Sequence, residues 1–187
     1  MNTRDIVSAD LVTTAKAVIT TLSGRNCMLG VSESVTGGTI ASCLTRVNGC
    51  SQVLFASQVL YSILGKSSFC DESIKNIADK GTVSDYIILR MLDCMSNRFF
   101  TILSKNSAVT PRFFVSLATC GVAGDPIEGL PRGTVLIGIS LHRKDGTCFG
   151  RDIRRHVFDG DRGAIMLAAT STALLLVLEK AGLLNLP

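Results

Sequence analysis

The sequence predicts an α/β protein, a three-layer α/β/α sandwich with a mixed, mostly parallel sheet of about five strands. Three observations support this class. Segments with helical periodicity alternate with short apolar runs of strand length in the first half of the chain. Strand-like segments follow one another directly in the second half, where the short turn KDGT adds an antiparallel pair. A length of 187 residues, 47% of them hydrophobic, suits one domain over residues 1–187.

The first half alternates between helices and strands. Residues 8–23 are expected to form an amphipathic helix, since apolar side chains recur there at helical spacing. A short buried strand is expected at 28–31, then a helix at 39–47 and a strand at 53–61. A long helix follows to residue 103, with Ser84 as its N-cap.

The second half is richer in strands. Residues 112–119 and 133–141 have strand length and composition, and a loop rich in Gly and Pro separates them. Residues 150–158 alternate less cleanly and are expected to form an edge strand. Residues 160–184 form a final helix that is apolar around most of its circumference, and we expect it to be buried. His142 and His156 have no partner pattern and are expected at the surface.

Composition argues against nucleic acid and membrane as partners. The net charge is only +4, the aromatic fraction is 5%, and no run of Lys and Arg is interleaved with aromatic residues. The longest uncharged run, residues 163–178, is about four residues short of the ~20 that span a bilayer. The N-terminus carries charges and lacks the apolar core of a signal peptide.

The cysteines indicate reduced thiols in a cytoplasmic protein. Seven cysteines are an odd number, none of them forms a Cys-x-x-Cys pair, and only two histidines are present. A disulfide framework and a metal site are therefore not expected.

The stretch SESVTGG lies where the first predicted strand ends and a helix begins. Ligands of open α/β sheets bind beyond the carboxyl ends of the strands. Gly37 and Gly38 allow a ligand to approach the backbone, while Ser34 and Thr36 supply hydroxyl groups beside the Glu33 carboxylate. An N-cap followed by a glycine turn explains the same residues without a ligand.

Further polar groups follow other strand ends. Tyr61 and Lys66 come after the second predicted strand, and small residues follow the third. Arg162 lies in the first turn of the last helix, where a cation opposes the helix dipole. An anionic ligand would explain Arg162, and so would a local ion pair with Asp159 or Asp161.

Taken together, the motifs SESVTGG, NGCS, LYSILGK, KGTVSD, CGVAG, PRGTV and FDGDR resemble the C-terminal domain of the competence/damage-inducible protein CinA. The resemblance covers about residues 28–178. The family includes bacterial nicotinamide-nucleotide amidases. It therefore implies hydrolysis of the carboxamide of nicotinamide mononucleotide, a small-molecule nucleotide, to nicotinic acid mononucleotide and ammonia, without metal or cofactor.

The resemblance also implies roles for individual residues. Ser51 matches the serine regarded as the nucleophile, Lys66 would be its general base, and Tyr61 would relay or orient the proton, with Ser34 a further catalytic candidate. The implied substrate-binding residues are Glu33, Thr36, Gly37, Gly38, Cys120, Gly121, Ala123, Gly124 and Arg162. Family members tend to associate, and the mean hydropathy of +0.38 also favours a homodimer.

The sequence departs from the family pattern near the expected pocket. Ile63 stands where the family usually has Asn, and Cys120 stands where it has Ser or Thr. Asp125 is an insertion, and Leu130 replaces a frequent Lys. Each lost hydrogen-bonding group can cost a polar site about 1–3 kcal/mol. A nucleotide-binding or structural relative without catalytic activity is therefore the alternative function.

Overall fold

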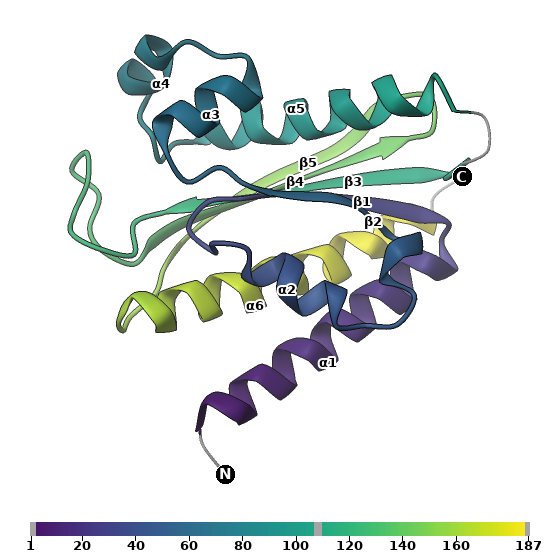
Figure 1. Cartoon of the computed structure of the whole chain (residues 1–187), viewed down its shortest axis with the longest axis horizontal. Helices are drawn as coiled ribbons and strands as arrows, with labels where there is room; N and C mark the ends of the chain where they lie inside the picture. Colours follow the sequence, from purple (N-terminus) through teal and green to yellow (C-terminus); the bar gives the residue numbers. More distant parts are fainter. Residues whose placement is uncertain (1–2, 107–109, 186–187) are drawn as a thin grey trace.

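The computed structural model describes residues 3–106 and 110–185, in which a five-stranded sheet separates two layers of helices (Figure 1). The strand order is β2-β1-β3-β4-β5. β1 pairs in parallel with β2 and β3, whereas β4 is antiparallel to both β3 and β5. The α/β class, the three layers and the mixed sheet are confirmed. The strands are β1 (Cys27–Glu33), β2 (Leu54–Val59), β3 (Phe113–Gly121), β4 (Thr134–Arg143) and β5 (Cys148–Val157).

Three helices cover each face of the sheet (Figure 1). One face carries α1 (Thr3–Gly24), α2 (Thr39–Thr45) and α6 (Arg162–Ala181). The other carries α3 (Ile63–Cys70), α4 (Ile74–Lys80) and α5 (Asp85–Leu103). Short 3-10 turns occupy Cys50–Gln52 and Gly182–Asn185.

The elements with long apolar patterns agree with the sequence prediction. Ser84 caps α5 by accepting a hydrogen bond from the Ile87 N–H at 3.3 Å. β5 lies at a sheet edge as expected, next to a β4 strand that is buried almost throughout. β1 extends past its predicted end to Glu33, so the first residues of the SESVTGG stretch belong to the strand.

Two short helices, α3 and α4, were not predicted. Each has only seven or eight residues, and α3 contains a glycine and two serines, which weaken the periodic signal. Their N-caps supply the local signal instead. The Ser62 hydroxyl accepts from the Gly65 N–H, and the Ser73 hydroxyl accepts from the Asn76 N–H.

The predicted surface position of His142 is wrong. Its side chain is 5% exposed, and its Nε2 lies 2.9 Å from the Ser140 hydroxyl and 3.1 Å from the Ser96 hydroxyl. Burial lowers the pKa of this imidazole. His142 occupies β4 at a position covered by α5, a tertiary contact that strand periodicity alone did not reveal. His156, in β5, is partly buried.

Among the described helices, the segment Arg162–Leu184, which comprises α6 and the turn after it, is long and apolar enough to span a bilayer. In the structure α6 lies along the sheet and against α1, with Ile165, Ala169 and Leu174 fully buried (Figure 1). The predicted burial holds for one face, while Leu175 is 54% exposed on the other. Core helices of globular domains have the same composition.

Candidate functional site

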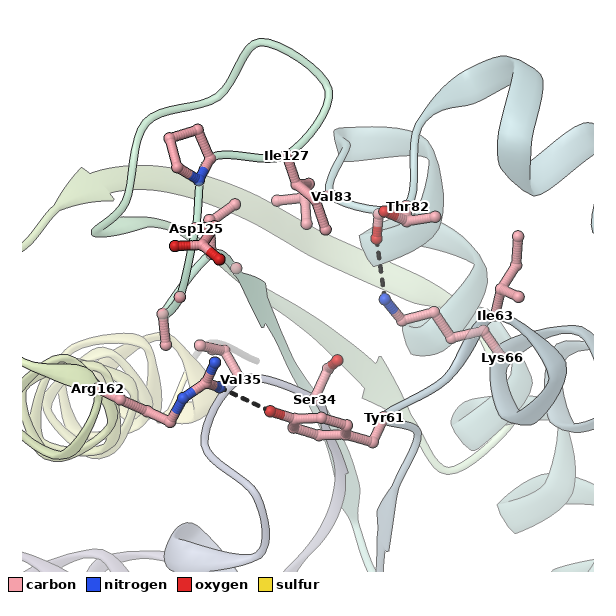
Figure 2. A pocket seen from close by; sticks show the side chains of 15 residues that line it. Ser34, Val35, Tyr61, Ile63, Lys66, Thr82, Val83, Asp125, Ile127 and Arg162 are labelled. Carbon is pink, nitrogen blue, oxygen red and sulfur yellow. Dashed lines mark hydrogen bonds between the residues drawn. The ribbon is translucent and has the colours of Figure 1, made fainter.

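A cavity of about 460 Å³ lies beyond the carboxyl ends of β1, β2 and β3 (Figure 2). Because these three strands run parallel, their carboxyl ends and following loops meet there. The lining residues come from five segments and are Ser34, Val35, Tyr61, Ile63, Lys66, Thr82, Val83, residues 121–127 and Arg162.

Lys66 reaches the cavity from α3. Its side chain is 4% exposed, and its Nζ donates to the Thr82 carbonyl at 2.9 Å and to the Cys120 Sγ at 3.3 Å. Within the described residues Lys66 forms no ion pair with a carboxylate. Cys120 is itself fully buried and does not line the cavity, so it contributes only through its contact with Lys66.

Arg162 and Tyr61 form the opposite wall (Figure 2). The Arg162 Nη1 donates to the Tyr61 hydroxyl at 2.9 Å. Asp161 instead caps α6 by accepting from the Ala164 N–H at 2.8 Å, and the described residues form no ion pair with Arg162. Local neutralisation by an aspartate therefore does not explain this arginine.

Ser34 lies between these two groups, and Figure 2 shows its side chain pointing into the cavity. Its backbone is held by β3, since the Ser34 N–H donates to the Thr119 hydroxyl at 3.4 Å. The Thr36 and Thr119 hydroxyls are 2.8 Å apart and buried, which ties the loop to β3. Thr36 thus positions Ser34 and does not itself line the cavity.

Glu33 and the glycine pair build the loop from behind. The buried Glu33 carboxylate accepts hydrogen bonds from the N–H groups of Gly38, Ile40 and Ala41, at 2.9, 3.2 and 2.9 Å. Gly38 adopts φ 94° at the N-cap of α2, where a Cβ would strain the backbone. The N–H groups at the start of α2 are therefore paired with the protein's own carboxylate. Glu33, Gly37 and Gly38 do not line this cavity, and their expected ligand contacts stay a prediction.

Within one chain the structure does not bring Ser51 and Lys66 together. Ser51 precedes β2, whereas Tyr61 and Lys66 follow it. Ser51 therefore lies near the amino end of this strand, and Tyr61 and Lys66 lie beyond its carboxyl end. The six residues of β2 separate them by about 20 Å, at about 3.3 Å per residue. Ser51 is exposed in the 3-10 turn, and Ser34 is the serine that shares the cavity with Lys66.

The loop of residues 121–127 lines the cavity and contains Gly121, Ala123 and Gly124. The N–H groups of Ala123 and Gly124 make no hydrogen bond within the described residues. These backbone donors are consequently available to an anionic or carbonyl oxygen.

Glu128 connects this loop to Thr82, the residue whose carbonyl accepts from Lys66. Its carboxylate accepts from the Thr82 N–H at 2.9 Å and from the Thr82 hydroxyl at 2.7 Å. Burial alone would raise the pKa of the Glu128 carboxyl, but these hydrogen bonds, one from the Val83 N–H and the charge of Lys66 together hold it below its usual value. The contact orients Thr82, whose carbonyl accepts from Lys66.

Replacing Glu128 by glutamine should remove a pH-dependent part of the stability. Because the folded protein lowers the pKa of this carboxyl, its contribution is complete above the ordinary value of 4.5 and disappears as the pH falls through the folded-state pKa. Near pH 6 the free energy of unfolding of the wild type should exceed that of Glu128→Gln by at most about 1 kcal/mol, because the group is exposed, and the wild-type Tm should be correspondingly higher. Thermal melts from pH 3 to pH 7 test this, and a Tm difference unaffected by pH would contradict it.

No cluster of three or more His, Cys, Asp or Glu side chains in the described part of the chain has the geometry of a metal site. The donors around the cavity are a lysine, an arginine, hydroxyl groups and backbone N–H groups. Such donors bind anions and polarised carbonyl oxygens.

The family model of the CinA C-terminal domain matches residues 11–181. The chain belongs to the CinA C-terminal domain family.

Relatives of CinA agree with this membership. The chain is 28% identical over 168 residues to a competence-damage inducible protein of Lacticaseibacillus casei, covering 88% of the chain and 36% of that protein. It is 30% identical over 127 residues to the protein of that name from Streptococcus pneumoniae, covering 67% and 28%. The chain thus spans about a third of the length of these CinA relatives.

Solved CinA structures share the fold. A CinA superfamily protein from Klebsiella pneumoniae superposes with a TM-score of 0.74 at 21% identity, covering 92% of this chain and 98% of that one. The competence/damage inducible protein CihA from Agrobacterium tumefaciens gives a TM-score of 0.67 at 25% identity, covering 95% and 96%.

Sequence reasoning missed several residues in and next to the cavity. Thr82 and Val83 line the cavity from a segment without a strand-end motif, and the Thr82 carbonyl accepts from Lys66. Glu128 acts from outside the cavity by accepting from the Thr82 hydroxyl. The motif KGTVSD contains Thr82 and pointed to its region. The Gly81-to-Ser84 turn therefore acts through a backbone carbonyl, which no residue type could have signalled.

Proposed function

We propose that this protein hydrolyses the carboxamide of nicotinamide mononucleotide to nicotinic acid mononucleotide and ammonia, with Ser34 and Lys66 as the reacting pair. The observation that carries the proposal is the buried Lys66, which has no carboxylate ion pair within the described residues and shares one cavity with Ser34. The substrate class comes from the family resemblance.

The chemistry requires one proton acceptor and one nucleophile. The Lys66 amine takes the proton of the Ser34 hydroxyl while Oγ bonds to the carboxamide carbon. The C–N bond then breaks, the nitrogen leaves as ammonia with the proton from Lys66, and an ester remains on Ser34. Water activated by the same amine cleaves that ester, releasing the carboxylate and restoring the hydroxyl.

The remaining cavity groups suit the rest of the substrate. Arg162 offers a guanidinium without an ion pair among the described residues for the phosphate, and Tyr61 fixes its orientation at 2.9 Å. The free N–H groups of Ala123 and Gly124 can stabilise negative charge on the carbonyl oxygen or on the phosphate. A cavity of about 460 Å³ is of the size that binds small molecules.

The same proposal extends to the setting of the reaction. We expect the activity to need neither a metal nor a cofactor and to take place in the cytoplasm. We also expect a homodimer, because α6 and the turn after it expose Leu167, Leu175 and Leu183 by 36, 54 and 42%. Light scattering at micromolar concentration tests the dimer, and a monomeric mass would contradict it.

A second function, nucleotide binding without turnover, is favoured by one observation. Ile63 lines the cavity where the family usually carries asparagine. An apolar side chain there removes a hydrogen bond that the carboxamide would otherwise receive, which can cost about 1–3 kcal/mol.

The deciding experiment measures ammonia release from nicotinamide mononucleotide in the presence of a chelator, with calorimetric binding measured in parallel. Release of ammonia with formation of nicotinic acid mononucleotide supports hydrolysis. Saturable binding without ammonia release at millimolar nucleotide favours the second function. The absence of both binding and ammonia release would contradict both functions.

Changing Gly124 to alanine should weaken substrate binding through Arg162. A Cβ at this position would lie 2.5 Å from the Arg162 Nη2, so the guanidinium has to move. We expect KM to rise about tenfold, roughly 1.4 kcal/mol, with a smaller change in kcat. Gly24→Ala is the control, because nothing lies within 4 Å of its Cβ. An unchanged KM in Gly124→Ala would remove Arg162 from substrate recognition.

A further inference from the structure

Two thiols from different helices meet on the side of the sheet covered by α3 and α5. Cys70 is the last residue of α3 and is fully buried, while Cys94 lies in the middle of α5 and is partly exposed. Both residues line the same cavity, their thiols interact electrostatically with each other, and both thiols are free. Nothing in the proposed hydrolysis uses this pair.

The pair borders a second cavity, of about 690 Å³, that is separate from the candidate site. Its lining includes both thiols, the guanidinium groups of Arg90 and Arg98, and the apolar side chain of Phe69. Arg90 donates to the Cys70 carbonyl at 3.1 Å, and Arg98 lies 3.8 Å from the centre of the Phe69 ring. The partly exposed Cys94 can therefore be reached by a small solute, beside two guanidinium groups and the Asp71 carboxylate. Of the two guanidinium groups, that of Arg90 is paired with Glu72 at 3.3 Å.

The two sulfur atoms have different roles in their contact. The interaction with the Cys70 thiol lowers the pKa of the Cys94 thiol, with further help from Arg90 and Arg98 against burial and the Asp93 charge. The same interaction, together with burial, raises the pKa of Cys70. Thiolate character, the property that makes a cysteine reactive, consequently concentrates on the more accessible sulfur, that of Cys94.

We propose that Cys70 and Cys94 are a hydroperoxide-reactive site that closes to an intramolecular disulfide. The Cys94 thiolate attacks one peroxide oxygen, the O–O bond breaks, and the hydroperoxide leaves as water or an alcohol while Cys94 becomes a sulfenic acid. The Cys70 sulfur then bonds to the Cys94 sulfur, and the sulfenic oxygen leaves as water. Overall, two thiols lose two electrons and two hydrogens, and one hydroperoxide is reduced.

The site is connected to the first cavity through α3. Lys66 and Cys70 are four residues apart on this helix, both are buried, and the Lys66 charge acts on the Cys70 thiol. A disulfide bond of about 2.05 Å is shorter than any non-bonded contact between two thiols, so closing it would draw the end of α3 towards α5. That movement would shift Lys66 relative to the Thr82 carbonyl. An effect of this shift on turnover rests on the proposed function.

The test treats the full chain with increasing hydrogen peroxide and follows free thiols, intact mass and linked peptides. We expect the first loss to be of two thiols and two hydrogens, with Cys70 and Cys94 in one linked peptide, reversed by dithiothreitol. Cys148→Ser is the control, because this exposed cysteine should not be needed. Cys94→Ser should lose the reaction without altering the core, and Cys70→Ser should leave a sulfenic acid that dimedone traps.

Two results would overturn the site. The first is early oxidation that maps to Cys148 or to links between chains, and the second is a pair that still forms when Cys94 is serine. Turnover is a separate measurement. If the disulfide forms and ammonia release falls severalfold in the wild type but not in Cys70→Ser, the connection to Lys66 holds. If the disulfide forms and turnover is unchanged, the connection is wrong and the site stands, and a protein without turnover still reports the disulfide by mass.

Discussion

Replacing Lys66 by methionine should remove nearly all hydrolysis of nicotinamide mononucleotide while the chain stays folded. Lys66 is the amine of the cavity that can take the serine proton, and methionine keeps an unbranched side chain of similar length without it. A positioned general base contributes about 10²–10⁴-fold, so kcat should fall by at least about 10²-fold, roughly 3 kcal/mol. Ammonia release at saturating substrate measures the loss.

Lys75→Met is the matched control for this variant. Lys75 is exposed on α4, outside the cavity, so its replacement should leave turnover unchanged. Circular dichroism and Tm establish that Lys66→Met has folded. Turnover by Lys66→Met within threefold of the wild type would show that another group accepts the proton.

Ser34→Ala should be as damaging as Lys66→Met, whereas Ser51→Ala should have nearly wild-type turnover. Ser34 shares the cavity with Lys66, and Ser51 lies near the amino end of β2. If Ser34 and Lys66 act as one unit, the double variant should be hardly slower than either single variant. Initial rates of the three single variants and the double variant, with nucleotide binding measured alongside, provide the comparison.

The opposite pattern would be equally informative. Loss of turnover in Ser51→Ala with Ser34→Ala still active would mean that Ser51 reaches the cavity of a second copy, because one chain separates it from Lys66 by the length of β2. Mixing inactive Ser51→Ala with inactive Lys66→Met would then restore activity in mixed dimers. Restored activity would identify Ser51, and not Ser34, as the nucleophile.

The fold was predictable wherever a local pattern extends over many residues. α5 and α6 repeat their apolar residues over many turns, and β3 and β4 are long apolar runs, so each element could be recognised from its own sequence. α3 and α4 are too short for periodicity to outweigh chance, although serine caps mark their first residues. Their omission mattered, because α3 carries Lys66.

The sequence by itself determined the fold class and the family, and it pointed to several residues that line the cavity, including Ser34, Tyr61, Lys66, Gly124 and Arg162. These conclusions depend on residue types and on their order along the chain.

The tertiary structure alone decided which of these groups meet. Ser51 and Lys66 are close in sequence, but an extended strand lies between them and places them at its opposite ends. Ser34 and Arg162 are far apart in sequence, and they meet because parallel strands place their following loops at one end of the sheet. The sequence predicted a ligand contact for Glu33. In the structure its carboxylate accepts from backbone N–H groups at the start of α2, which only the folded loop brings to it.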